Sequence, residues 1–173
     1  MTRPAQRGFT MVELIVTMVI IGILAVVVLP RFDLLRGFDE IGYRDQVKAT
    51  LEYARKAAVA QRRSVQVTIA STTPPCSAAG DRCLAVAVQR QTPEGEGTAS
   101  WVALTLPGSS ASSIRVPSAV TSFTGVSPLD FDALGRPTGS ANCPTGTPVN
   151  FCFTITGDST QIITVERETG YVR

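Results

Sequence analysis

The sequence predicts an α+β protein in which a long N-terminal helix is followed by an antiparallel β-rich head. Two observations lead to this fold class. A strongly apolar run extends from Phe9 to Leu29 and is stopped by Pro30. Beyond residue 63, short segments of alternating apolar and polar residues are separated by loops rich in Gly, Pro, Ser and Thr, which is typical of strands. A chain of 173 residues has room for one such head besides the helix.

The apolar run is long enough to enter a bilayer. At about 1.5 Å per residue, a helix over 9–29 is about 30 Å long, which is the thickness of a hydrocarbon core. Arg3 and Arg7 precede the run and no acidic residue does, which favours a cytoplasmic N-terminus and a translocated head. The end of the run, Val27 to Pro30, lacks the small residues of a signal-peptidase site. We therefore expect the apolar segment to remain in the mature protein.

Glu13 lies inside the apolar run. A carboxylate in a membrane helix costs a few kcal/mol unless it is paired, and such residues are usually functional. One interpretation is an interfacial glutamate within a turn of the membrane edge. The other, which we favour, is a carboxylate that pairs with a cation of a neighbouring molecule, and a newly exposed α-amine on Phe9 would supply that cation. In that case Glu13 would set the register of packed helices.

From Arg31 to about Arg63 the pattern becomes amphipathic. Its apolar positions follow helical spacing and predict one buried face: Val47, Leu51, Ala54 and Ala58. Gly37 and Gly42 weaken the helix near its start. Four basic residues gather toward its end: Arg55, Lys56, Arg62 and Arg63. They fit a lipid or nucleic-acid patch, although a solvated helix face or salt bridges between subunits are the simpler interpretations.

The remaining residues predict strands. The expected strands are 65–69, 84–88, 101–106, 113–116, 149–155 and 161–166. Gly157-Asp158 lies between the last two and predicts a hairpin turn. This order gives an antiparallel sheet against which the helix would pack.

Four cysteines are present: Cys76, Cys83, Cys143 and Cys152. Their spacings lack the paired C-x2-C pattern of zinc ribbons. An even number in an exported head favours disulfides, for which three connectivities are possible. We favour Cys76–Cys83 and Cys143–Cys152 because each closes a short loop, and four reduced thiols remain the alternative.

The composition argues against catalysis. Histidine is absent, which removes Ser-His-Asp and Cys-His catalysis and most zinc sites. No phosphate-binding loop is present, so we expect no cofactor, no metal and no enzymatic activity. The formal net charge is +2, and it falls to zero without Arg3 and Arg7, which does not fit a strongly basic nucleic-acid binder.

The N-terminus resembles a known class of leader. Gly8-Phe9-Thr10-Met11-Val12-Glu13, the apolar helix and Pro30 are similar to the class III leader and N-terminal helix of type IV pilins and type II secretion pseudopilins. The resemblance implies that prepilin peptidase cleaves between Gly8 and Phe9 and methylates the Phe9 amine. It also implies assembly with other pilin or pseudopilin subunits through the helix that carries Glu13 and Pro30. The expected segments are a leader (1–8), a transmembrane and polymerisation helix (9–30), an amphipathic helix (31–63) and a periplasmic head (64–173).

The C-terminal third resembles the GspH/FimT family. Leu129 to Pro137 contains a strand and a Gly-Arg-Pro turn, and two further strands and a Gly-containing tail, Glu168 to Arg173, follow. The resemblance implies a pilin-like fold and a single-pass protein of the inner membrane. We expect a minor pseudopilin of a type II secretion system, which would help to export folded proteins.

Two alternatives remain. One is a FimT/FimU-like minor pilin involved in pilus assembly or DNA uptake, with Arg167 and Arg173 as candidate DNA contacts. The tail Gly170-Tyr171-Val172-Arg173 has Tyr171 where DNA-capturing members carry a first arginine, which weakens this alternative. The other is a membrane-anchored periplasmic protein that never polymerises, and Glu13 and the Gly8–Phe9 junction argue against it.

Overall fold

The computed structural model describes residues 9–28, 34–71, 76, 81–90, 100–143 and 150–173. The chain divides into two compact units, Met1–Arg36 and Gly37–Arg173, and each is described by itself. Within the described ranges, no helix is both long enough and apolar enough to cross a membrane.

The first unit contains helix α1, Met11–Val28. Thr10 caps its N-terminus: the Thr10 hydroxyl accepts a hydrogen bond from the Glu13 backbone N–H at 3.3 Å. The Thr10 carbonyl accepts the first intrahelical bond from Leu14 at 3.2 Å. Thr10 to Glu13 is thus a Thr-x-x-Glu sequence of the capping-box type, which satisfies an orphan donor at the helix start. The Thr17 hydroxyl donates a hydrogen bond to the Leu14 carbonyl at 2.9 Å.

Helix α2 spans Leu34–Gln61 and supplies one layer of the head. The face predicted from helical spacing is confirmed, since Val47, Leu51, Ala54 and Ala58 are fully buried. The helix ends in a Schellman-type turn, in which Arg62 N–H donates to Val59 O and Arg63 N–H donates to Ala58 O. Arg62 adopts a positive φ of 50° there, a position that glycine usually occupies.

The strands of the head form two antiparallel sheets. Sheet A contains β1 (Val65–Ala70), β2 (Cys83–Gln89), β3 (Trp101–Ala103), β4 (Ser113–Arg115), β6 (Leu129–Phe131) and β7 (Pro137–Thr138). Its order is β3-β2-β1-β6-β7, and β4 pairs with β2 beyond the end of β3. Sheet B contains β5 (Ser122–Gly125), β8 (Phe151–Thr156) and β9 (Thr160–Val165), in the order β5-β8-β9. The hairpin predicted at Gly157-Asp158 joins β8 to β9.

The strands differ from the sequence prediction in three places. β5 and β7 were not predicted, because Phe123 is the one large apolar residue in β5 and β7 has only 2 residues. β3 stops at Ala103 instead of reaching Leu106. The chain turns between Leu106 and Ala111: Leu106 N–H donates to Ala111 O, and Ser109 N–H donates to Leu106 O.

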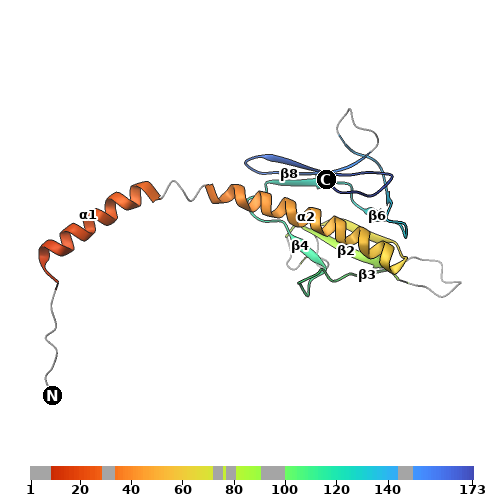
Figure 1. Ribbon diagram of the computed structural model, residues 1–173, viewed down its shortest axis with the longest axis horizontal. Helices are drawn as coiled ribbons and strands as arrows, with labels where there is room; N and C mark the ends of the chain where they lie inside the picture. Colours follow the sequence, from red (N-terminus) through yellow and green to blue (C-terminus); the bar gives the residue numbers. More distant parts are fainter. Residues whose placement is uncertain (1–8, 29–33, 72–75, 77–80, 91–99, 144–149) are drawn as a thin grey trace, which may run out of the picture. The chain divides into compact units, whose positions relative to one another are not determined.

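Helix α2 lies across both sheets, and the core fills the space between them (Figure 1). Tyr43 of α2 packs edge-on against Phe123 of β5 at a ring-centroid distance of 5.5 Å. Phe123 in turn stacks on Phe153 of β8 at 6.2 Å. On the side of sheet A, the Tyr53 hydroxyl donates to the Thr105 carbonyl. These contacts confirm the α+β class, with two small sheets under one helix.

Candidate functional site

The surface of α1 is apolar and open on all sides. Every side chain described between Phe9 and Val26 is exposed, and the exposed fraction reaches 81% at Met11 and 78% at Phe9. A soluble monomer rarely presents a contiguous apolar surface of this extent, so such a surface indicates a protein–protein or membrane contact. Gly8 and Pro30, the two other N-terminal site residues predicted from the sequence, lie outside the described residues.

Glu13 is the one charged residue of α1 and lies in its first turn. A carboxylate there is favoured by the positive end of the helix dipole, and its backbone N–H is bound by Thr10. No ion pair to the Glu13 side chain is formed within the described part of the chain. The capping sequence therefore explains the position of Glu13 at the helix start, and its carboxylate remains available to another molecule.

The head contains two disulfides, and both are local. Cys76 is bonded to Cys83 with an S–S distance of 2.05 Å, and Cys143 is bonded to Cys152 with 1.96 Å. Cys83 begins β2 of sheet A, and Cys152 lies in β8 of sheet B. Each disulfide therefore ties a preceding loop residue, Cys76 or Cys143, covalently to a strand. These are the two pairs favoured above among the three connectivities.

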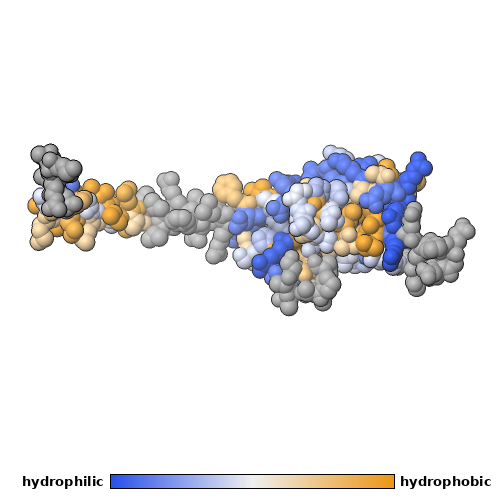
Figure 2. All heavy atoms as spheres, turned by 90° about the horizontal axis from the view of Figure 1, so that it is seen from below, coloured by the Kyte–Doolittle hydropathy of each residue, from blue (hydrophilic) through white to orange (hydrophobic). Residues whose placement is uncertain are grey.

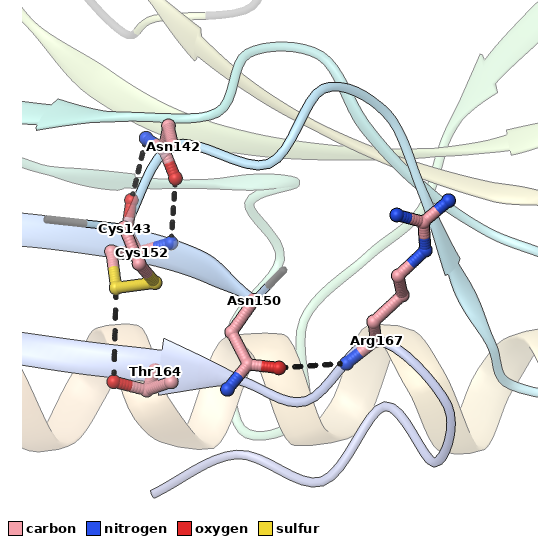
Figure 3. The surroundings of a disulfide bond; sticks show 6 residues. All are labelled: Asn142, Cys143, Asn150, Cys152, Thr164 and Arg167. Atoms are coloured by element: carbon pink, nitrogen blue, oxygen red, sulfur yellow. Dashed lines mark hydrogen bonds between the residues drawn. A yellow bond between two sulfur atoms is a disulfide. The ribbon is translucent and has the colours of Figure 1, made fainter. Parts of the chain in front are cut away.

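Hydrogen bonds beside the Cys143–Cys152 disulfide extend the pairing of sheet B (Figure 3). The Asn142 carboxamide donates to the Cys152 carbonyl at 3.0 Å and accepts from the Cys152 N–H at 2.7 Å. β5 pairs with β8 only as far as Gly125 and Phe153. Asn142 thus takes the place of the next residue of β5 as a hydrogen-bond partner for β8. The disulfide joins Cys143, the neighbour of Asn142, to the same residue of β8, Cys152.

The C-terminal arginines predicted as candidate DNA contacts have different surroundings. Arg173 forms an ion pair with Glu166 at 3.1 Å. Arg167 is exposed, and its backbone N–H donates to the side chain of the buried Asn150 at 3.3 Å. Arg167 also lines an open pocket of about 280 Å³ together with Arg136. The structure therefore brings Arg136, and not Arg173, to the same pocket as Arg167.

A buried glutamate, Glu40 of α2, was not predicted. It is 1% exposed and binds the β8–β9 turn: its carboxylate accepts from the Asp158 N–H, the Ser159 N–H and the Ser159 hydroxyl. A Cβ on Gly157 would collide with this carboxylate, so the turn needs glycine there. The hydrogen bond from Asp158 lowers the pKa of Glu40, and desolvation only partly opposes it.

Tyr43 lies one turn further along α2. Its hydroxyl is buried and has no hydrogen-bond partner within the described residues. Burial raises the pKa of Tyr43, and the positive charge of Arg82 opposes that shift. The same Arg82 donates to the carbonyls of Val120 and Thr121. Across the described ranges, no group of three or more His, Cys, Asp or Glu side chains is placed to hold a metal ion.

Comparison with protein families identifies the N-terminal segment. Residues 3–29 match the family model described as "Prokaryotic N-terminal methylation motif". This chain carries the prepilin-type N-terminus of pilins and pseudopilins. The resemblance seen at Gly8 to Glu13 is thereby confirmed. The prepilin motif supports a membrane-anchored structural subunit, not an enzyme, that is processed by prepilin peptidase and assembles with other pilin subunits.

Two other comparisons add little to the motif. No curated protein matches the chain. Among solved structures, the type IV minor pilin FimU of Pseudomonas aeruginosa is similar over 75% of this chain and 82% of its own, at 20% identity and a TM-score of 0.44.

Proposed function

We propose that this protein is a minor pseudopilin, similar to GspH, in the periplasmic pseudopilus of a type II secretion system. In this role the leader 1–8 is removed by prepilin peptidase and residues 9–30 hold the protein in the inner membrane until they polymerise. The amphipathic helix 31–63 then continues into the head, 64–173, on the periplasmic side. The observation that carries the proposal is the prepilin motif at residues 3–29, which contains the exposed apolar helix α1.

The properties of α1 support assembly. The side chains of α1 are apolar around the whole circumference of the helix, so α1 can be covered equally well by lipid or by neighbouring helices. Its one carboxylate, Glu13, forms no ion pair with any described residue and would pair with the α-amine of a processed neighbour. Such a pair would be made in a medium of low dielectric constant, where charge pairing strongly favours one register.

Substitutions of Glu13 separate this role from helix capping. Glu13→Gln keeps a residue type that suits the third helical position and removes the charge. We expect Glu13→Gln and Glu13→Val to insert into the inner membrane at normal levels but to enter sheared filaments at a small fraction of the wild-type amount. Thr10→Val, which removes the capping hydroxyl and keeps Glu13, is the matched control and should assemble.

Quantitative immunoblotting of membrane and filament fractions measures both steps. Equal incorporation of Glu13→Gln and wild type would contradict a role for the charge and leave capping as the function of this residue. Loss of both variants from the membrane fraction would instead show that Glu13 acts during insertion.

A second candidate is a FimT/FimU-like minor pilin that takes part in pilus assembly or DNA uptake. The observation in its favour is the pocket that Arg136 and Arg167 share, because neither guanidinium has an ion-pair partner within the described residues. Asp132 and Glu168 line the same pocket and offset that charge, and Arg173 is already paired. Phosphate binding would therefore be weak.

A clean deletion distinguishes the two candidates. If the pseudopilin role is right, the deletion strain loses secretion of folded exoproteins and keeps twitching and transformation. Loss of transformation with normal secretion would favour the minor pilin. Complementation with Arg136→Ala/Arg167→Ala then tests the pocket, because a DNA role requires that this variant restore filaments without restoring uptake.

A further inference from the structure

We propose that the free edge of β3, residues Trp101–Ala103, is a docking site for an extended, partly acidic segment of a partner protein. The segment would add a strand to sheet A. The inference goes beyond filament assembly through α1, because it concerns the head alone and uses none of the N-terminal residues.

The backbone of β3 pairs with a described strand on one side only. That strand is β2, in the register Gln89 to Trp101 and Ala87 to Ala103. Arg90 N–H donates to Ser100 O, and Leu104 N–H donates to Val86 O. In the segment from Ser100 to Leu104, the even-numbered residues are therefore the ones that bond to β2. Hydrogen bonding alternates along an antiparallel pair, so the N–H and C=O groups of Trp101 and Ala103 point away from β2. None of them has a partner among the described residues.

The side chains at this edge are apolar on both faces of the sheet. Trp101 is 36% exposed and Val102 is 46% exposed, and all three residues of β3 are exposed. Trp101 shares a face with its partner Gln89, and Val102 shares the opposite face with Val88. Figure 2 views the molecule from the side on which β3 lies in Figure 1, and shows a hydrophobic area on the head bordered by hydrophilic residues.

An edge of this kind is unusual in a solitary protein. Natural edge strands are commonly protected by charged residues, proline or a covering segment, because unpaired edge groups template pairing with another chain. β3 carries no charge or proline, and it presents tryptophan, the residue most enriched among interface hot spots. Strand addition uses both features, since backbone bonds give affinity and alternate side chains give specificity.

The neighbouring charges define the partner. Arg90 follows β2 and lies beside Ser100, at the N-terminal end of β3, and its exposed guanidinium has no partner among the described residues. Arg63 lies just before β1, next to Ser64, whose carbonyl accepts a bond from Gln89, and the Arg63 Nε is buried without a partner among the described residues. A strand that runs antiparallel to β3 brings its C-terminal end to these arginines. The fitting segment is therefore extended, apolar at alternate positions and acidic at its C-terminal end.

Trp101 itself reports on binding, because it is the one tryptophan of the chain. The probe is a blocked peptide, Thr-Val-Thr-Val-Glu-Glu, titrated into the full-length protein in detergent micelles while tryptophan emission is recorded. The matched peptide ends in Lys-Lys. We expect a saturable blue shift of the emission with the acidic peptide, and an affinity at least about tenfold weaker for the basic one.

Two variants locate the contact. Ala103→Pro removes an outward N–H and leaves the bonds to β2 in place, so it should abolish the shift while the circular dichroism spectrum is unchanged. Arg90→Glu should reverse the preference between the two peptides. Arg136→Glu, at an exposed arginine away from β3 that forms no ion pair with a described residue, should not. Reversal by Arg90→Glu keeps the proposal testable even if the proline variant fails to fold.

Three results would overturn the proposal. The first is an emission that neither peptide shifts. The second is a shift that appears on concentrating the protein alone, which would make a second copy the occupant. The third is a shift with anionic lipid vesicles and not with peptide, which would make the site a membrane contact.

Discussion

Glu13 and Glu40 are both helix glutamates in an otherwise apolar setting, and their surroundings assign them opposite roles. Glu40 is enclosed and fully bonded to the β8–β9 turn, 118 positions away in the sequence. Glu13 is exposed, and its carboxylate has no ion-pair partner in the described part of the chain. Burial of a bonded carboxylate serves the fold, whereas an open carboxylate on an apolar helix serves a contact with another molecule.

Glu40 makes the stability of the head depend on pH. Its folded-state pKa lies below the ordinary value of 4.5, so its contribution is present above that value and is lost as the pH falls through the folded pKa. We expect the melting temperature of the wild type to fall steeply below about pH 4.5, and that of Glu40→Gln to be lower at pH 7 and to fall less on acidification. Thermal melts from pH 7 to pH 3 measure this.

Asp39→Asn is the matched control, because Asp39 is exposed and adjacent in sequence. Its pH profile should follow that of the wild type. A Glu40→Gln profile parallel to the wild type would show that other carboxyl groups carry the acid sensitivity.

Arg62 holds a backbone conformation that side chains disfavour. Its φ of 50° at the end of α2 is the position where glycine normally completes a Schellman turn. Arg62→Gly should therefore raise the free energy of unfolding by about 0.5–1 kcal/mol. Ala60→Gly, two residues earlier in ordinary helical geometry, should lower it by about 1 kcal/mol. Chemical denaturation of both variants tests the pair, and a loss of stability in Arg62→Gly would contradict the assignment.

Some of these residues were predictable and others were not. The Thr10-x-x-Glu13 sequence is a recognised helix start, and it would have explained part of the position of Glu13 from the sequence alone. Glu40 gave no comparable indication, because its partners are backbone groups of a distant turn. Arg62 was read as part of a basic cluster, since a positive φ at a non-glycine residue leaves no trace in composition.

At the scale of elements, the disulfide Cys143–Cys152 ties the segment before β8 to the strand itself. The loop it closes spans 9 positions, so its removal should cost about 2–3 kcal/mol by relaxing the restriction of the unfolded chain. We expect this loss in the double variant Cys143→Ser/Cys152→Ser, measured by urea unfolding. Asn142→Ala, which removes both bonds to Cys152 and keeps the disulfide, should cost less.

The double variant Cys76→Ser/Cys83→Ser gives the comparison, because its loop of 7 positions is of similar length. Free thiols at all four cysteines in the purified protein, found by alkylation and non-reducing peptide mapping, would contradict the pairing. An unfolding free energy unchanged by the Cys143 and Cys152 substitutions would contradict the stabilising role.

The elements most visible in the sequence were those with strong periodicity. The buried stripe of α2 and the alternation of β8 follow from spacing alone, and both are present as predicted. β5 and β7 lack that pattern because they are short, and they exist through pairing with β8 and β6. The division into two sheets also depends on these pairings, which local sequence does not encode.

The two units differ in how their apolar side chains are placed. In unit Met1–Arg36 the side chains that the structure describes, residues 9–26, are all exposed, whereas the buried core residues of the described chain belong to Gly37–Arg173. An exposed apolar helix is explained when other molecules complete it, which is what the prepilin motif at residues 3–29 implies. The head would then determine which filament and which partners are chosen, through surfaces such as β3.

The processing of the N-terminus is tested by the intact mass of the protein extracted from membranes of cells that contain prepilin peptidase. We predict a chain that begins at Phe9, lacks residues 1–8 and carries one additional methyl group on its amine. The same protein from cells without the peptidase should retain the leader and lack the methyl group. A chain that keeps residues 1–8 in the presence of the peptidase would contradict the assignment of this protein as a prepilin-type subunit.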